Sequence, residues 1–169
     1  MALVPVLIAL AITAPALPAP SDCLWEAVGP TQRQTWLGLY NSDPRALMKT
    51  TLTADRTAGL AASCSVPPGK VRDVLVARVL ETGAEAWWDR EMQAPGALAR
   101  SWAALSEPER AQMRRWAATA IDDGNGDEVE MDALPAFLRA AGLEDPNGPA
   151  MTHLMGYLLG RGYRELPLD

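Results

Sequence analysis

Carboxylate side chains gather in one segment of the chain, residues 121–132, which reads Ile-Asp-Asp-Gly-Asn-Gly-Asp-Glu-Val-Glu-Met-Asp. Six of its residues are acidic and none is Lys or Arg. The rest of the chain has as many acidic as basic side chains, so the formal net charge of −6 comes from this segment. Carboxylates this close repel one another unless solvent, a cation or a basic partner relieves the repulsion. Carboxylate and amide oxygens are also the ligands that Ca²⁺ prefers, which makes the segment the first candidate for chemistry.

The sequence on each side of the segment has the pattern of a helix, and these two helices would have to hold the oxygens in place. Residues 114–142 therefore resemble an EF-hand, the helix–loop–helix unit that binds calcium. The resemblance implies a calcium site. Its implied ligands are Asp123, Asn125 and Asp127, with Asp122, Glu130 and Asp132 as additional candidates.

The segment departs from the EF-hand pattern in both of its alignments. A start at Asp122 puts Val129 at the aliphatic eighth position but glycines at the third and fifth. A start at Asp123 gives the ligand triplet but leaves the segment one residue short before the second helix. The bidentate glutamate of the twelfth position is lost in both, because Ala133 or Leu134 takes its place. The alternative is an acidic turn between helices with no dedicated ion, and no other cofactor is expected.

Catalytic chemistry by a histidine would have to use His153, the single histidine of the chain. No Gly-x-Ser-x-Gly motif is present to supply a serine nucleophile. His153 lies beside the apolar positions Met151 and Leu154, a setting that favours a packed side chain over a catalytic one. Further along, four residues are expected to fray into solvent at the end of the last helix: Tyr157, Arg161, Tyr163 and Arg164.

The first residues predict export. Residues 1–16 form an uncharged, largely aliphatic run that ends in Ala14-Pro15-Ala16, which is typical of a secretory signal with an Ala-x-Ala cleavage site. Cleavage is expected after Ala16, with later positions in 19–22 as the alternative. In an oxidising compartment the two cysteines, Cys23 and Cys64, are expected to pair. Closing that loop would stabilise the fold by about 4 kcal/mol on the chain-entropy estimate.

The remaining chain predicts one all-α domain over residues 23–166, a bundle of short capped helices. Helix starts are indicated at Thr31 with Gln34, at Asp43-Pro44, at Thr53 and at Ser106-Glu107-Pro108-Glu109. Valines and leucines from Val71 to Leu80 predict a helix that ends near Gly83, followed by a separate helix over 84–93. Gly156-x-x-x-Gly160 is expected to allow close helix packing in the last helix.

The net negative charge argues against a nucleic-acid partner, which would need a basic surface. No stable membrane insertion is expected after the signal is removed. The leading hypothesis is therefore an exported, periplasmic or secreted protein without catalytic activity, with an interaction or structural role toward a protein partner. The alternatives are a weak calcium-binding protein and, third, a small hydrolase that uses His153 or a pair of carboxylates.

Overall fold

The structure is a computed structural model that describes residues 19–124, 131–143 and 148–168. Over these residues the chain is helical and has no strand, which confirms the all-α prediction. The elements, in chain order, are α1 (Pro20–Val28), α2 (Pro30–Ser42), α3 (Pro44–Leu47), α4 (Ala54–Cys64), α5 (Pro68–Glu91), α6 (Ala97–Ala104), α7 (Glu107–Ala118), the π-helical turn η1 (Thr119–Asp123), α8 (Leu134–Ala140) and α9 (Gly148–Arg164). None of the described helices is long and apolar enough to cross a membrane.

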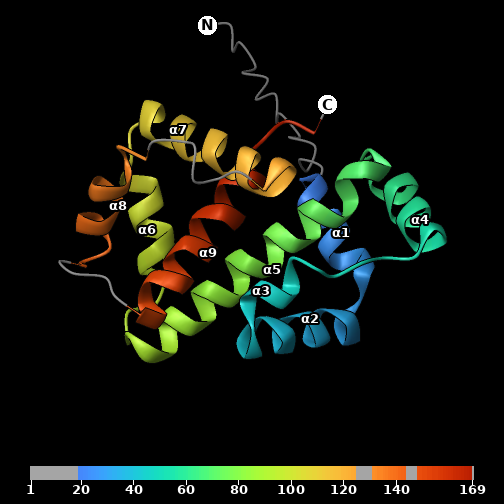
Figure 1. Cartoon of the computed structure of the whole chain (residues 1–169), viewed down its shortest axis with the longest axis horizontal. Helices are drawn as coiled ribbons and strands as arrows, with labels where there is room; N and C mark the ends of the chain where they lie inside the picture. Colours follow the sequence, from blue (N-terminus) through green and yellow to red (C-terminus); the bar gives the residue numbers. More distant parts are fainter. Residues whose placement is uncertain (1–18, 125–130, 144–147, 169) are drawn as a thin grey trace, which may run out of the picture.

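The centre of the molecule is the pair α5 and α9. Figure 1 shows α5 running obliquely through the middle with α9 alongside, α1–α4 gathered on one side and α6–α8 on the other. The two helices approach closely at Gly160, where an added Cβ would lie 2.3 Å from the carbonyl oxygen of Ala77. Only glycine fits there, so the expected role of Gly160 in close helix packing is confirmed.

The expected break at Gly83 is wrong, because α5 continues without interruption for 24 residues. Gly83 instead makes room for a neighbouring side chain: a Cβ on it would lie 2.4 Å from the ring of Tyr40 on α2. Helix α5 is covered on more than one side, and that packing outweighs the weak helix preference of one glycine.

A disulfide fastens the N-terminal helices, as predicted. Cys23 on α1 is bonded to Cys64 at the end of α4, with an S–S distance of 2.03 Å and a Cα–Cα distance of 5.6 Å. Nearby, the Arg56 guanidinium donates to the carbonyl oxygens of Ala27 and Val28 at the end of α1. Helices α1 and α4 are thus joined by a covalent bond and by hydrogen bonds.

The predicted helix starts are confirmed at three positions. The Asp43 carboxylate accepts from the backbone N–H of Arg45, and the Thr53 hydroxyl accepts from that of Arg56. The Glu109 carboxylate accepts from the backbone N–H of Ser106 at 2.7 Å, within a capping box.

The fourth predicted start, at Thr31 with Gln34, is wrong. Helix α2 begins at Pro30, immediately after Gly29, which has a φ of +86° and also ends α1. The left-handed backbone of Gly29 turns the chain directly from one helix into the next, so Thr31 lies inside the first turn.

Helices α6, α7 and α8 cover the other side of α9. Gly162 faces Met113 and Ala117 of α7, and the ring of Tyr157 stacks on Phe137 of α8 at 6.0 Å between centroids. Tyr157 and Tyr163 are therefore buried. The expectation that this end of the last helix frays into solvent is wrong, because α7 and α8 pack over it.

Candidate functional site

The acidic segment is described only at its two ends. Helix α7 passes into η1, and Gly124 turns the chain with a φ of +74°. Asp122, Asp123 and Asp132 are described, whereas Asn125, Asp127 and Glu130 lie outside the described residues. The proposed calcium ligand set therefore stays a prediction.

Both carboxylate oxygens of Asp122 accept hydrogen bonds from distant helices. The Tyr163 hydroxyl donates to Oδ1 at 2.7 Å, and Lys70 Nζ donates to Oδ2 at 2.8 Å. Partial burial alone would raise the pKa of Asp122, but the hydrogen bonds from Lys70 and Tyr163 outweigh it, so the pKa lies below its usual value. The Lys70 ammonium therefore compensates part of the negative charge at this end of the acidic segment.

At the far end of the segment, a side-chain amide binds the backbone. Ala133, which takes the twelfth loop position in the ungapped alignment, is buried, and its backbone N–H donates to Oε1 of Gln112 on α7 at 2.9 Å. This bond connects α7 to the start of α8 without a carboxylate. Within the described ranges, no three His, Cys, Asp or Glu side chains converge as metal ligands would.

A buried glutamate on α5, Glu81, is the most enclosed charge among the described residues. Its side chain is 1% exposed. Arg164 donates to it through Nε at 2.6 Å and a second nitrogen at 2.8 Å, Arg78 donates at 2.9 Å and Arg161 at 3.1 Å. Burial raises the pKa of Glu81, but the three arginines together outweigh burial and lower the pKa below its usual value. The carboxylate therefore stays ionised, as a buried charge with good partners can.

The arginines of this cluster reach further acids. Arg161 also donates to Glu165 at 2.9 Å, and the indole N–H of Trp102 on α6 donates to the same carboxylate at 3.0 Å. Arg114 on α7 bonds Glu165 at 3.4 Å. The network ties α9 to α5, α6 and α7, so its evident role is to hold the bundle together.

Glu81 is not among the site residues that the sequence patterns predict. The signal was present, since Glu81 follows directly on the apolar run that ends at Leu80 and falls on the same buried helix. A charge at a buried position needs partners, and Arg161 and Arg164, one turn apart, could have been considered as those partners.

His153 is packed between aromatic side chains and is 9% exposed. Its ring stacks on Trp87 at 4.2 Å between centroids, and Tyr40 Oη lies 2.6 Å from Nδ1. In the neutral tautomer that carries its proton on Nε2, Nδ1 accepts the proton of the Tyr40 hydroxyl. Burial, and next the nearby charge of Arg90, lower the pKa of His153, which favours this neutral form.

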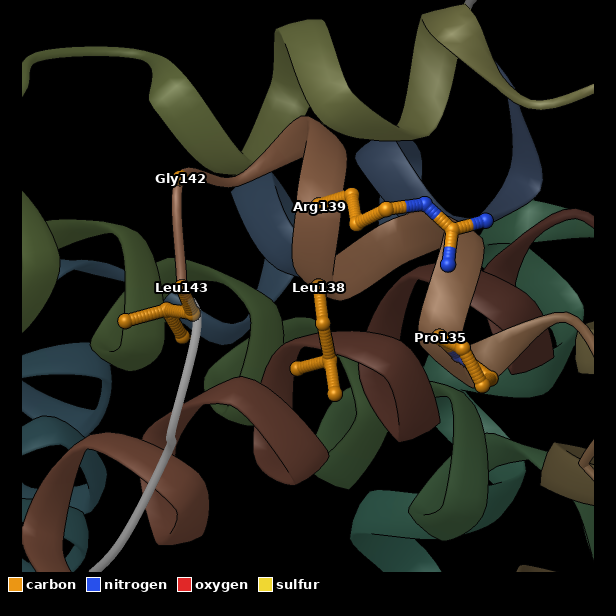
Figure 2. Close-up of a pocket in the computed structure, with 5 residues that line it drawn as sticks. All are labelled: Pro135, Leu138, Arg139, Gly142 and Leu143. Carbon is orange, nitrogen blue, oxygen red and sulfur yellow. The ribbon is translucent and has the colours of Figure 1, made fainter.

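Several depressions lie on the surface of the described residues. One of about 340 Å³ lies beside the end of the acidic segment and is lined by Pro108, Glu109, Gln112, Arg115, Asp132 and Ala133. Another, of about 460 Å³, is lined by Pro135, Leu138, Arg139, Gly142 and Leu143 on and after α8. Figure 2 shows Leu138 and Leu143 beside it, with the Arg139 guanidinium directed away from Gly142. Its lining holds a single charged side chain, that of Arg139, so it supports no assignment.

A further depression, a groove of about 270 Å³ between α3 and α9, is called here the α3–α9 groove. It is lined almost entirely by apolar atoms. Its residues are Pro44, Arg45, Met48, Leu80, Thr152, Met155, Gly156 and Leu159. Thr152 and Met155 lie close to His153 in sequence, but His153 is not part of the lining.

No family model, no curated protein and no solved structure matches this chain. Its function is therefore inferred from its own residues.

Proposed function

We propose that the protein is an exported, non-catalytic helical module that acts by binding another protein. The observation that carries the proposal is the Cys23–Cys64 disulfide, which joins α1 to α4. Such bonds form and persist in oxidising compartments and are rare in the cytosol. Together with the signal-like residues 1–16, the disulfide favours a periplasmic or secreted location.

The polar clusters support the non-catalytic part of the proposal. Glu81 is surrounded by arginines, Asp122 is bonded on both oxygens, and His153 lies between Tyr40 and Trp87. Each of these groups has structural partners, and holding those partners is a sufficient reason for its presence. The α3–α9 groove offers an apolar surface for a binding partner.

Export is tested by expressing the chain from Met1 in a Gram-negative host, beside a matched chain whose residues 2–16 are deleted. The full chain should be recovered from the periplasm, beginning at Leu17 by mass spectrometry and without alkylatable thiols. The deleted chain should stay in the cytoplasm with both thiols reduced. Full chain that stays in the cytoplasm with its first residues intact would contradict the proposal.

Catalysis is tested on the same purified protein with chromogenic esters, phosphate monoesters and a casein substrate. No turnover above the buffer rate is expected. Turnover that disappears in His153→Gln, while the melting temperature is retained, would replace this proposal with the hydrolase alternative.

A further inference from the structure

The α3–α9 groove has an apolar floor and adaptable walls. Leu80 of α5 is 3% exposed and lines the groove at its base, and a Cβ added to Gly156 would lie 3.9 Å from the Leu80 side chain. Met48, at the end of α3, and Met155, on α9, line the two helices that border the groove. Methionine side chains are flexible and polarisable, so walls made of them can adjust to apolar groups of different shapes.

The groove has room for a side chain. An enclosed apolar cavity of about 150 Å³ accommodates a benzene ring. At about 270 Å³ and open to solvent, the α3–α9 groove can take one leucine- or phenylalanine-sized side chain and part of its backbone.

One residue of the groove lining, Arg45, carries a positive charge. Arg45 is exposed and forms no ion pair with any described residue. Lys49 follows one turn later, is also exposed and also lacks a described carboxylate partner. Asp43, the nearest acid in sequence, uses its carboxylate to cap α3. By contrast, the arginines around Glu81 all have carboxylate partners.

We propose that the α3–α9 groove binds a segment of a partner protein in which an apolar side chain stands next to a carboxylate. The apolar side chain lies on Leu80 between Met48 and Met155, and the carboxylate pairs with Arg45. The inference rests on the proposed function, because it names the partner that the exported module binds. The charge of Arg45 selects an acidic segment, and the rest of the lining selects an apolar one.

The test begins with a random 12-residue peptide library displayed on phage and selected on the oxidised protein. We expect enriched peptides that place Leu, Ile, Phe or Met beside Asp or Glu. One enriched peptide is then synthesised and its Kd measured by calorimetry. Arg45→Glu should weaken binding at least tenfold, and so should Thr152→Trp, which covers the groove with an indole at an exposed position.

Arg115→Glu is the matched control, because Arg115 is exposed and unpaired among the described residues but lies on α7, outside the groove. It should leave the Kd unchanged. A peptide in which the acid is replaced by Lys should bind wild type poorly and recover affinity for Arg45→Glu. All variants are first checked for an unchanged melting temperature, and any that unfolds is replaced by Arg45→Gln or Met155→Gln.

Three results would overturn the inference: no enriched peptide, enriched peptides without a carboxylate, or a peptide Kd that Arg45→Glu leaves unchanged. Self-association that Thr152→Trp abolishes would make a second copy of the chain the occupant, and saturable binding of laurate in place of peptides would make it a fatty acid. In each of these cases the expression experiment with the full chain and the chain lacking residues 2–16 still decides separately whether the protein is exported.

Discussion

Glu81 and Asp122 are both carboxylates held by basic groups from distant parts of the chain, but their surroundings differ. Glu81 lies on α5 directly after an apolar run, is 1% exposed, and receives hydrogen bonds from three arginines. Asp122 stands among other acids, has a side chain that is 31% exposed, and is held by one lysine and one tyrosine.

From this difference we expect burial, and not the local density of acids, to decide how strongly a carboxylate depends on its partners. Water and dissolved ions can screen the charge of Asp122 if Lys70 is lost. They cannot reach Glu81, so its charge depends on Arg78, Arg161 and Arg164. The six acids of residues 121–132 dominate the sequence, yet the single buried acid should dominate the stability.

The largest expected effect comes from Glu81→Gln. The change keeps the shape of the side chain but leaves its arginines without a buried counter-charge, and removing one partner of a buried ion pair costs about 4 kcal/mol. Urea unfolding followed by circular dichroism measures the loss. Glu26→Gln is the matched control, since Glu26 also bonds an arginine, Arg33, but has a side chain that is 74% exposed.

The control should lose no more than about 0.5 kcal/mol, as exposed pairs do. A similar loss in both variants would show that burial does not distinguish the two glutamates, and the comparison between Glu81 and Asp122 would fail with it.

Gly160→Ala should have the next largest effect, because Gly160 brings α9 close enough for Arg161 and Arg164 to reach Glu81. The added Cβ would lie 2.3 Å from the carbonyl oxygen of Ala77 and 2.5 Å from the backbone nitrogen of Glu81, neither of which can rotate away. Forcing the two helices apart should cost about 3 kcal/mol in the same urea experiment.

Gly59→Ala provides the control for helix propensity. Gly59 lies in α4 with nothing within 4 Å of its added Cβ, so alanine there should stabilise the fold by roughly 0.5–1 kcal/mol. A loss of stability at Gly160 and a gain at Gly59 would separate the effect of packing from that of helix propensity. An unaffected Gly160→Ala would mean that α5 and α9 do not approach as described.

Local signals in the sequence predicted much of this fold. Asp43, Thr53 and Ser106 mark helix starts because a cap depends only on the residues of one turn. The disulfide followed from having two cysteines in a chain predicted to be exported.

Features that depend on contacts between distant helices were not predictable in the same way. The local pattern predicts a helix end at Gly83, because the Tyr40 ring for which this glycine makes room comes from 43 residues earlier in the chain. The arginine cluster was missed for the same reason, since Glu81 and Arg164 are 83 residues apart. The acidic segment attracted attention because its charges are adjacent in sequence, although one of them, Asp122, finds its partners on α5 and α9.

A smaller effect is expected from Asp122→Asn. The variant loses the ion pair with Lys70 but keeps an oxygen for the Tyr163 hydroxyl, and the side chain is partly exposed, so the loss should be about 1 kcal/mol. Thermal unfolding at low and high salt measures it. A loss as large as that of Glu81→Gln would show that the acidic segment, too, depends on a single buried contact.

The smallest effect should be that of calcium. Both oxygens of Asp122 are already bonded within the protein, and buried Ala133 stands where the ungapped alignment requires a bidentate glutamate. At about 1 mM Ca²⁺, a concentration that saturates many extracellular calcium modules, the melting temperature should therefore rise by less than about 1 °C. Mg²⁺ at the same concentration is the control for non-specific screening of the acids. A larger, calcium-specific rise that Asp123→Ala and Asp127→Ala abolish would restore the EF-hand alternative. The acidic segment would then be stabilised by a bound ion, whereas Glu81 is stabilised only by side chains of the protein itself.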